Sequence, residues 1–457
     1  MRQNQLLRVL GIGLLSAWFM LVPDGHSGWV IWPCLVIFYA VALPAFRPIE
    51  VKHGLKTQLA ARPLFYLYVY LLFFYPYQLH VLGLYDLEGN QFLKASFIEK
   101  SNASILLSMI AVLSFDVGCL QTIQRPRKDP NSGAYGLVPW ILAGGLLSVF
   151  AFYCISGLPA ALVGAYAGST TGNTTSDGIY FLCTAFSMWT AGAFIFYISS
   201  RKKVPPPIWV GIAVAAAWSM ILLVLGDRNN FFLIALVLAA GYATFVRRVP
   251  LMALALAVLA ALFVYNVVEV ARTSEDRSLQ AIQQAAGSIR ESSGGIERGS
   301  FGITTTTGRA ALDIAENKTG YFYGKLKLIG FAGIIPYSRS LFVDTNDRFQ
   351  ASSKIFTYWM VGPYATWGVG SNVISDAYMD FGLPGVIIFM FLLGLFAKYA
   401  QIKVQENIDS MKWVTIYLVM VATFAEMARY TVDFPVRCIV WAFFVFYAGA
   451  KLRRMRW

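Results

Sequence analysis

The stretch of sequence that decides the fold runs from Ala271 to Asp380 and opens with ARTSEDRSLQAIQQAAGSIR (residues 271–290). It is the only long segment that is too polar to cross a bilayer, and apolar segments precede and follow it. Helical spacing of apolar residues predicts an amphipathic helix from Ser278, and a second helix is expected to open with the Thr304–Thr307 run. The piece Tyr321–Ile335 is apolar, but it is short and broken by glycines, which favours a re-entrant or interfacial element. We therefore expect this stretch to carry the functional site of a membrane protein.

The composition of the whole chain excludes an ordinary soluble domain. Of its 457 residues, 57% are hydrophobic and 13% are charged, and the mean hydropathy is +0.59. The net charge of +13 could suit nucleic acid, but the excess Lys and Arg lie in the short loops of one side. Basic loops face the cytoplasm. The charge therefore indicates membrane topology, and no nucleic-acid partner is expected.

Apolar windows of the length that a bilayer requires recur along the chain and predict an all-α polytopic membrane protein with about 12 transmembrane helices. Helices 1–9 are expected within residues 1–270, the large extracytoplasmic loop at 271–381, and helices 10–12 within 382–457. Both termini are predicted to be cytoplasmic. The windows begin near Leu6, Trp29, Leu64, Ala103, Leu137, Ile179, Pro207, Phe231, Leu251, Gly382, Trp413 and Cys438.

Cysteine and histidine are placed where they support neither a disulfide framework nor a metal site. The five cysteines fall in or at the ends of apolar windows, and no two form a CxxC pair. His26, His53 and His80 all lie outside the large loop. A Ser/His/Asp triad or a histidine metal site in that loop is therefore excluded, and we expect neither a metal nor a cofactor.

Three arginines lie where predicted spans meet the outer surface: Arg228, Arg429 and Arg437. Each could be an interfacial snorkelling residue or a local ion pair, such as Arg228 with Asp227. Topology disfavours arginine on the outer side, however, and several converging there favour a functional role.

An enzyme that forms bonds on the outer face needs a substrate that arrives already activated, and a lipid-linked diphosphate is such a substrate. Guanidinium groups bind its phosphates with paired hydrogen bonds and would stabilise the charge that grows as the pyrophosphate leaves. A carboxylate would orient or deprotonate the acceptor hydroxyl. Each outer-side acid could instead be solvated or paired with an arginine. The candidates are Asp227, Asp344, Asp376, Asp380, Glu426 and Asp433.

Four local patterns, together with the single large loop, resemble the bacterial O-antigen polymerase (Wzy) family of oligosaccharide repeat-unit polymerases. They are the turn Gly226–Asn229, the Pro-x-x-basic-x-Leu-like segment Ile334–Phe342, the acidic and aromatic entry Asp376–Gly385, and the outer loop Met427–Arg437. Arg309 and Gly320 also fit the Arg-x10-Gly spacing described for the family.

The resemblance implies a GT-C-like glycosyltransferase of the bacterial inner membrane that needs no metal. Its donor would be a glycan on undecaprenyl diphosphate, and its acceptor the non-reducing-end hydroxyl of another lipid-linked repeat unit. A chain-length regulator and a flippase are the expected protein partners. The predicted catalytic residues are Arg228, Arg339, Arg429, Asp380 and Glu426, and the predicted substrate-binding residues are Arg272, Arg309, Arg437, Tyr378 and Asp433.

Two alternatives remain at this point. An O-antigen ligase has similar topology and the same donor, but ligases of that kind carry a histidine in the large outer loop, and this loop has none. A transporter of lipid-linked oligosaccharide or polysaccharide would be expected to show an internal repeat and mid-membrane charges, both of which are missing or rare here.

Overall fold

A computed structural model gives the arrangement of most of the chain. It describes residues 3–47, 50–51, 55–56, 58–87, 93–124, 126, 128–129, 136–156, 174–250, 252–261, 263, 300–335, 338–342, 349–365 and 367–454. The amphipathic helix expected from Ser278 and the candidate Arg272 lie outside the described residues.

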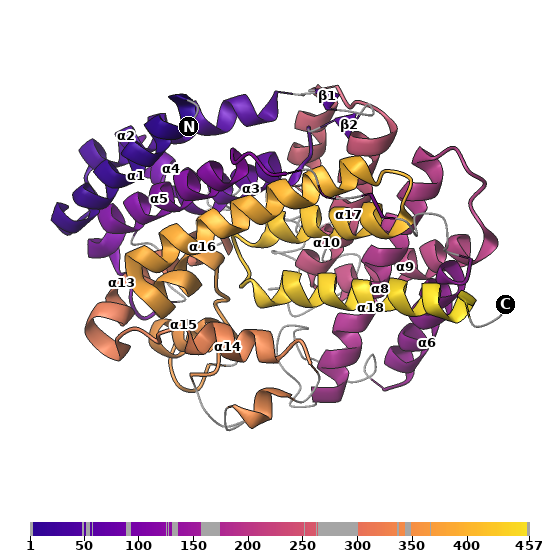
Figure 1. The fold of residues 1–457 in the computed structure, drawn as a ribbon. Coiled ribbons are helices and arrows are strands. Elements are labelled where there is room, and N and C mark those ends of the chain that lie inside the picture. Colours follow the sequence, from indigo (N-terminus) through magenta and orange to yellow (C-terminus); the bar gives the residue numbers. More distant parts are fainter. Residues whose placement is uncertain are drawn as a thin grey trace.

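The described part of the chain is a bundle of α-helices with one small antiparallel strand pair (Figure 1). The α-helices are α1 (Gln3–Leu21), α2 (Gly28–Ala42), α3 (Ala61–Val69), α4 (Tyr75–Val81), α5 (Ser101–Cys119), α6 (Val138–Ser156), α8 (Thr174–Ser199), α9 (Pro206–Val224), α10 (Arg228–Gly241), α13 (Ser300–Ile314), α14 (Lys325–Ala332), α15 (Ser352–Met360), α16 (Val373–Glu406), α17 (Met411–Glu426) and α18 (Asp433–Arg454). The shorter elements are η1 (Leu43–Phe46), η3 (Tyr70–Phe74), η4 (Ile98–Lys100), η5 (Tyr242–Val246), η6 (Ala315–Thr319), η7 (Ser338–Leu341), β1 (Glu50–Val51) and β2 (Leu55–Lys56).

The helical spans confirm a polytopic membrane protein. Within the described ranges, nine helices are long and apolar enough to cross a membrane, and each coincides with one of the predicted windows. The other three windows are also helical, as the run α3–η3–α4, the segment Met252–Ala261, and α17. The total of twelve spans stays a prediction, because these three pieces are short or contain a π-helical turn.

Predicted outer loops contact one another, and predicted inner loops do the same. On the outer side the amide of Gly25 donates to the carbonyl of Glu99 at 2.6 Å, and Lys100 pairs with Glu316 at 3.0 Å. On the inner side Gln58 donates to the carbonyl of Val249 at 2.9 Å. Figure 1 shows α13, α14 and α15 gathered around the start of α16, while β1, β2 and the C-terminus lie on the opposite side of the view. The described helices α14 and α15 of the large loop and the β1–β2 strand pair therefore occupy opposite ends of the bundle.

Helix α13 belongs to the large loop in sequence but lies inside the bundle in space. Its Thr304–Thr307 run is buried, and it packs against η3, α5 and α16. Hydroxyl groups allow this burial, because Thr306 donates to the carbonyl of Gly302 within the same helix, and Thr305 donates to the carbonyl of Leu72 at 2.7 Å. Part of the polar stretch is thus a structural element of the membrane domain.

A kink at Gly382 sets the direction of the first part of α16. Its φ of 65° and ψ of −156° are strained for any residue with a side chain, and an added Cβ would lie 3.2 Å from the ring of Tyr321. The kink separates the buried outer segment, which carries Asp376 and Asp380, from the apolar span that follows.

Candidate functional site

An elongated apolar cavity of about 660 Å³ lies among α3, η3, α10 and the helical segment Met252–Ala261. Its walls along α10 include Phe232, Ala235 and Ala239. Residues 229–239 of one helix span about 15 Å, at 1.5 Å per residue. The lining becomes polar at Asn229, Glu426 and Arg429. The cavity therefore runs along much of α10 and ends at charged groups.

The polar end of this cavity is built by the meeting of two helix ends. Asp227 caps α10, because its carboxylate accepts from the amide of Asn230 at 3.2 Å, and this fixes Arg228 at the first position of the helix. Glu426 is the last residue of α17 and is 3% exposed. It interacts electrostatically with Arg429 and Arg228 as well as with Asp227. The structure thus brings two of the predicted catalytic arginines to one predicted catalytic carboxylate.

A second charged cluster joins α14 to the outer segment of α16. The Lys327 ammonium donates to Asp376 at 2.5 Å and to Asp380 at 3.3 Å. Asp380 also accepts from the backbone amides of Leu326 and Lys327, each at 3.1 Å. These amides belong to the first turn of α14, so Asp380 holds the start of that helix.

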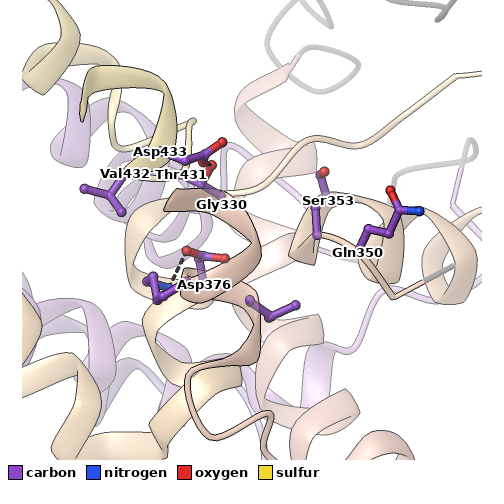
Figure 2. A pocket seen from close by; sticks show the side chains of 10 residues that line it. Gly330, Gln350, Ser353, Asp376, Thr431, Val432 and Asp433 are labelled. Carbon is purple, nitrogen blue, oxygen red and sulfur yellow. Dashed lines mark hydrogen bonds and ion pairs between the residues drawn. The ribbon is translucent and has the colours of Figure 1, made fainter. Parts of the chain in front are cut away.

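Beside this cluster lies a smaller polar cavity of about 170 Å³ (Figure 2). Its lining includes Gly330 of α14, Asp376 of α16, Thr431 from the α17–α18 connection and Asp433 at the start of α18. Ser353 lines it from the start of α15. Figure 2 shows Asp433 and Thr431 close to Gly330, with Asp376 on the nearby turn of α16.

The remaining predicted substrate residues have varied surroundings. Tyr378 is buried and donates to Glu316 at 3.1 Å. Arg437 lies 3.9 Å from Asp433, one turn away on α18. Arg309 is 2% exposed inside α13 and donates to the carbonyl of Leu87 at 3.2 Å and to the hydroxyl of Thr306 at 2.8 Å.

Burial lowers the pKa of the Arg309 guanidinium from its usual value by removing it from water. Its placement is that of a buried structural residue, away from both cavities. Arg339 lies in η7, but its side chain is not among the described parts of the structure. Arg272 as a whole lies outside the described residues. Whether Arg339 joins Arg228 and Arg429 therefore stays a prediction.

Comparison with known families supplies the observation that decides the classification. The family model described as O-antigen polysaccharide polymerase Wzy matches residues 59–449, which is most of the chain. The chain belongs to the O-antigen polymerase (Wzy) family. It is therefore an integral membrane protein and a glycosyltransferase-like polymerase of O-antigen polysaccharide. No curated protein and no solved structure gives a significant match.

Within this Wzy-family chain, two site residues were not predicted from sequence. Lys327 was missed because a lysine in the apolar run Lys325–Ala332 is typical of an interfacial element. Its spacing from the acidic pair on α16 is visible only once α14 docks there. Asn229 was overlooked although it stands next to Arg228 in the Gly226–Asn229 turn, which was a usable signal.

Proposed function

We propose that the chain joins oligosaccharide repeat units carried on undecaprenyl diphosphate into surface polysaccharide. The reaction takes place at the outer face of the bacterial inner membrane, with both chain termini in the cytoplasm. The observation that carries this proposal is the apolar cavity along α10 that ends at Asn229, Glu426 and Arg429.

The cavity suits a ligand with a long apolar chain and an anionic head group. Leu, Phe and Ala side chains form most of its lining, which favours a prenyl chain over a free sugar nucleotide. Arg429 and the nearby charge of Arg228 then meet the diphosphate. Glu426, which interacts with both arginines, holds their positive charge at this end of the cavity. The geometry thus matches a lipid diphosphate donor.

The reaction is a glycosyl transfer from the lipid diphosphate. The bond between the anomeric carbon and the phosphate oxygen breaks, and its electron pair stays on the departing diphosphate. The acceptor hydroxyl oxygen forms the new bond to that carbon and gives its proton to a carboxylate. Arg429 and Arg228 stabilise the charge that grows on the leaving group.

We infer that this reaction needs no divalent cation. The acids at this end of the bundle already face cations, since Asp376 and Asp380 hold Lys327, and Asp433 faces Arg437. The charge neutralisation that a metal would supply is assigned to the arginines. A chain-length regulator and a flippase are the proposed protein partners.

Surface polysaccharide from a deletion strain, with and without the gene restored, tests this function on a gel. If the protein is a polymerase, the deletion strain carries only single repeat units on its surface, and restoring the gene returns the ladder of polymer bands. Loss of all surface-attached glycan, with intact polymer still on its carrier, would instead indicate a ligase. Accumulation of single lipid-linked units on the cytoplasmic side would indicate a transporter.

A further inference from the structure

The 170 Å³ polar cavity of Figure 2 is distinct from the apolar cavity, yet both open onto the same short segment of chain. Arg429 lines the apolar cavity, and Thr431 lines the polar one. Consecutive Cα atoms are 3.80 Å apart, so the Cα atoms of these two residues lie at most about 7.6 Å apart. A group bound in the polar cavity is therefore near the backbone of the segment that carries Arg429.

The lining of the polar cavity disfavours charged ligands. Asp376 and Asp433 would repel an anion, since the lysine of the lining, Lys327, is already paired with Asp376. A cation would have to compete with the Lys327 ammonium, which already contacts Asp376 at 2.5 Å and Asp380 at 3.3 Å. The charges around the polar cavity therefore favour a neutral ligand.

Neutral polar side chains in the lining favour a ligand rich in hydroxyl groups. Gln350, Ser353 and Thr431 can each donate and accept hydrogen bonds, as a sugar requires. Leu326 and Val432 add apolar surface for the C–H face of a sugar ring. The volume has room for several water molecules, and hence for one ring-sized polar group.

We propose that this cavity binds the non-reducing-end sugar of the acceptor, and that Asp433 receives the proton of the attacking hydroxyl. This inference rests on the proposed function and assigns its second substrate. Asp433 lines the cavity at the start of α18, where its Oδ1 accepts from the Thr431 hydroxyl and its Oδ2 pairs with Arg437 at 3.9 Å. As the hydroxyl oxygen bonds to the anomeric carbon, its proton passes to Asp433, and the donor diphosphate leaves with the electron pair of the broken bond.

Binding and turnover of two variants test the proposal on the purified full-length protein. The probe is the repeat-unit oligosaccharide released from its lipid carrier by mild acid, and its binding is followed by saturation-transfer NMR. Ser353→Phe places a ring in the cavity and should weaken oligosaccharide binding by roughly tenfold or more. Lys354→Phe is the matched control, because it puts the same ring at the next, exposed position of α15 and should bind as the wild type does.

The variant Asp433→Asn shows whether Asp433 accepts the proton of the attacking hydroxyl or only contacts the sugar. It should keep oligosaccharide binding within a few fold and lower polymer formation by roughly a hundredfold or more. Wild-type binding by Ser353→Phe, no binding by the wild type, or full turnover by Asp433→Asn would overturn the assignment. If the wild type binds the oligosaccharide through this cavity but forms no polymer from lipid-linked units, the proposed function falls while the sugar site stands.

Discussion

Charged residues at the outer end of the bundle differ in their burial and in their hydrogen-bond partners, and these differences indicate different roles. Arg429 is half-buried at the polar end of a large cavity. Asp380 is fully buried, and both of its oxygens accept backbone amides from α14. The first arrangement suits contact with a ligand, and the second suits the support of a helix.

Replacing Arg429 tests the contact with the donor. Arg429→Ala should lower turnover by a hundredfold to a thousandfold, or roughly 3 to 4 kcal/mol, because the departing diphosphate loses a preorganised charge. Arg429→Lys should recover little of it, since lysine lacks the planar fork. Polymer formation normalised to folded protein is the measurement, with exposed Arg248→Ala at the opposite end as the control. Wild-type turnover in Arg429→Ala would remove this residue from the reaction.

Replacing Asp380 distinguishes a structural role, which supports α14, from the predicted catalytic role. Asp380→Asn keeps the shape and one acceptor but loses the charge, so it should lower the stability of the folded protein by about 2 kcal/mol. Turnover per folded molecule should fall only a few fold. Thermal melting in detergent and polymer formation are measured together, with exposed Asp409→Asn as the control. Unchanged melting with turnover lost roughly a thousandfold would instead make Asp380 the catalytic base.

Some of these residues could be predicted from sequence, and others could not. Arg228 and Arg429 were found because both stand at the outer end of an apolar window, where topology disfavours arginine. Arg309 fits the Arg-x10-Gly spacing, but it donates to the carbonyl of Leu87 and the hydroxyl of Thr306 inside the bundle. Its environment depends on where α13 docks, and a local pattern does not encode that.

Among the described helices, α5 and α16 pack especially closely against each other. An added Cβ at Gly118 would lie 2.7 Å from the amide nitrogen of Leu395, and one at Gly394 would lie 3.0 Å from the amide nitrogen of Cys119. Reciprocal glycines let the two backbones touch, as is typical of helices in membranes. This contact aligns α16, whose outer segment carries Asp376 and Asp380.

Gly118→Ala should force these helices apart and lower the stability of the folded protein by about 1–3 kcal/mol through overpacking. Gly144→Ala in α6 is the control, because an added Cβ there meets nothing within 4 Å and should cost nothing. Melting of both purified variants in detergent gives the comparison. Equal melting of the two would contradict the close packing of α5 against α16.

The positions of the helices in the sequence were easier to predict than their burial within the bundle. In the residues that the structure describes, each of the twelve apolar windows is helical, because a run of apolar residues must satisfy its backbone internally in a bilayer. The burial of α13 was not expected, since the helix expected to open with four consecutive threonines belongs to a stretch that is too polar to cross a bilayer. Their hydroxyls bond to backbone carbonyls, and this removes the cost of burying them.

For the molecule as a whole, the two ends of the bundle should lie on opposite sides of the membrane. Tyr364, 93% exposed near α15, belongs to the large loop, whereas exposed Lys202 belongs to a predicted inner loop. In a cysteine-free background, Tyr364→Cys should react with an impermeant maleimide in intact cells and Lys202→Cys should react only after lysis. The reverse pattern would overturn the orientation that the basic loops predict.

Polymer formation by purified protein from a defined undecaprenyl-diphosphate repeat unit in excess chelator tests directly whether the apolar cavity holds the donor of a metal-independent reaction. The variant Ala235→Trp fills the apolar cavity, and Ala216→Trp places the same ring on the exposed face of α9. We predict a polymer ladder from the wild type and from Ala216→Trp, and only single units from Ala235→Trp. A full ladder from Ala235→Trp, or a wild type that needs added magnesium or manganese, would contradict a metal-independent reaction on a donor held in this cavity.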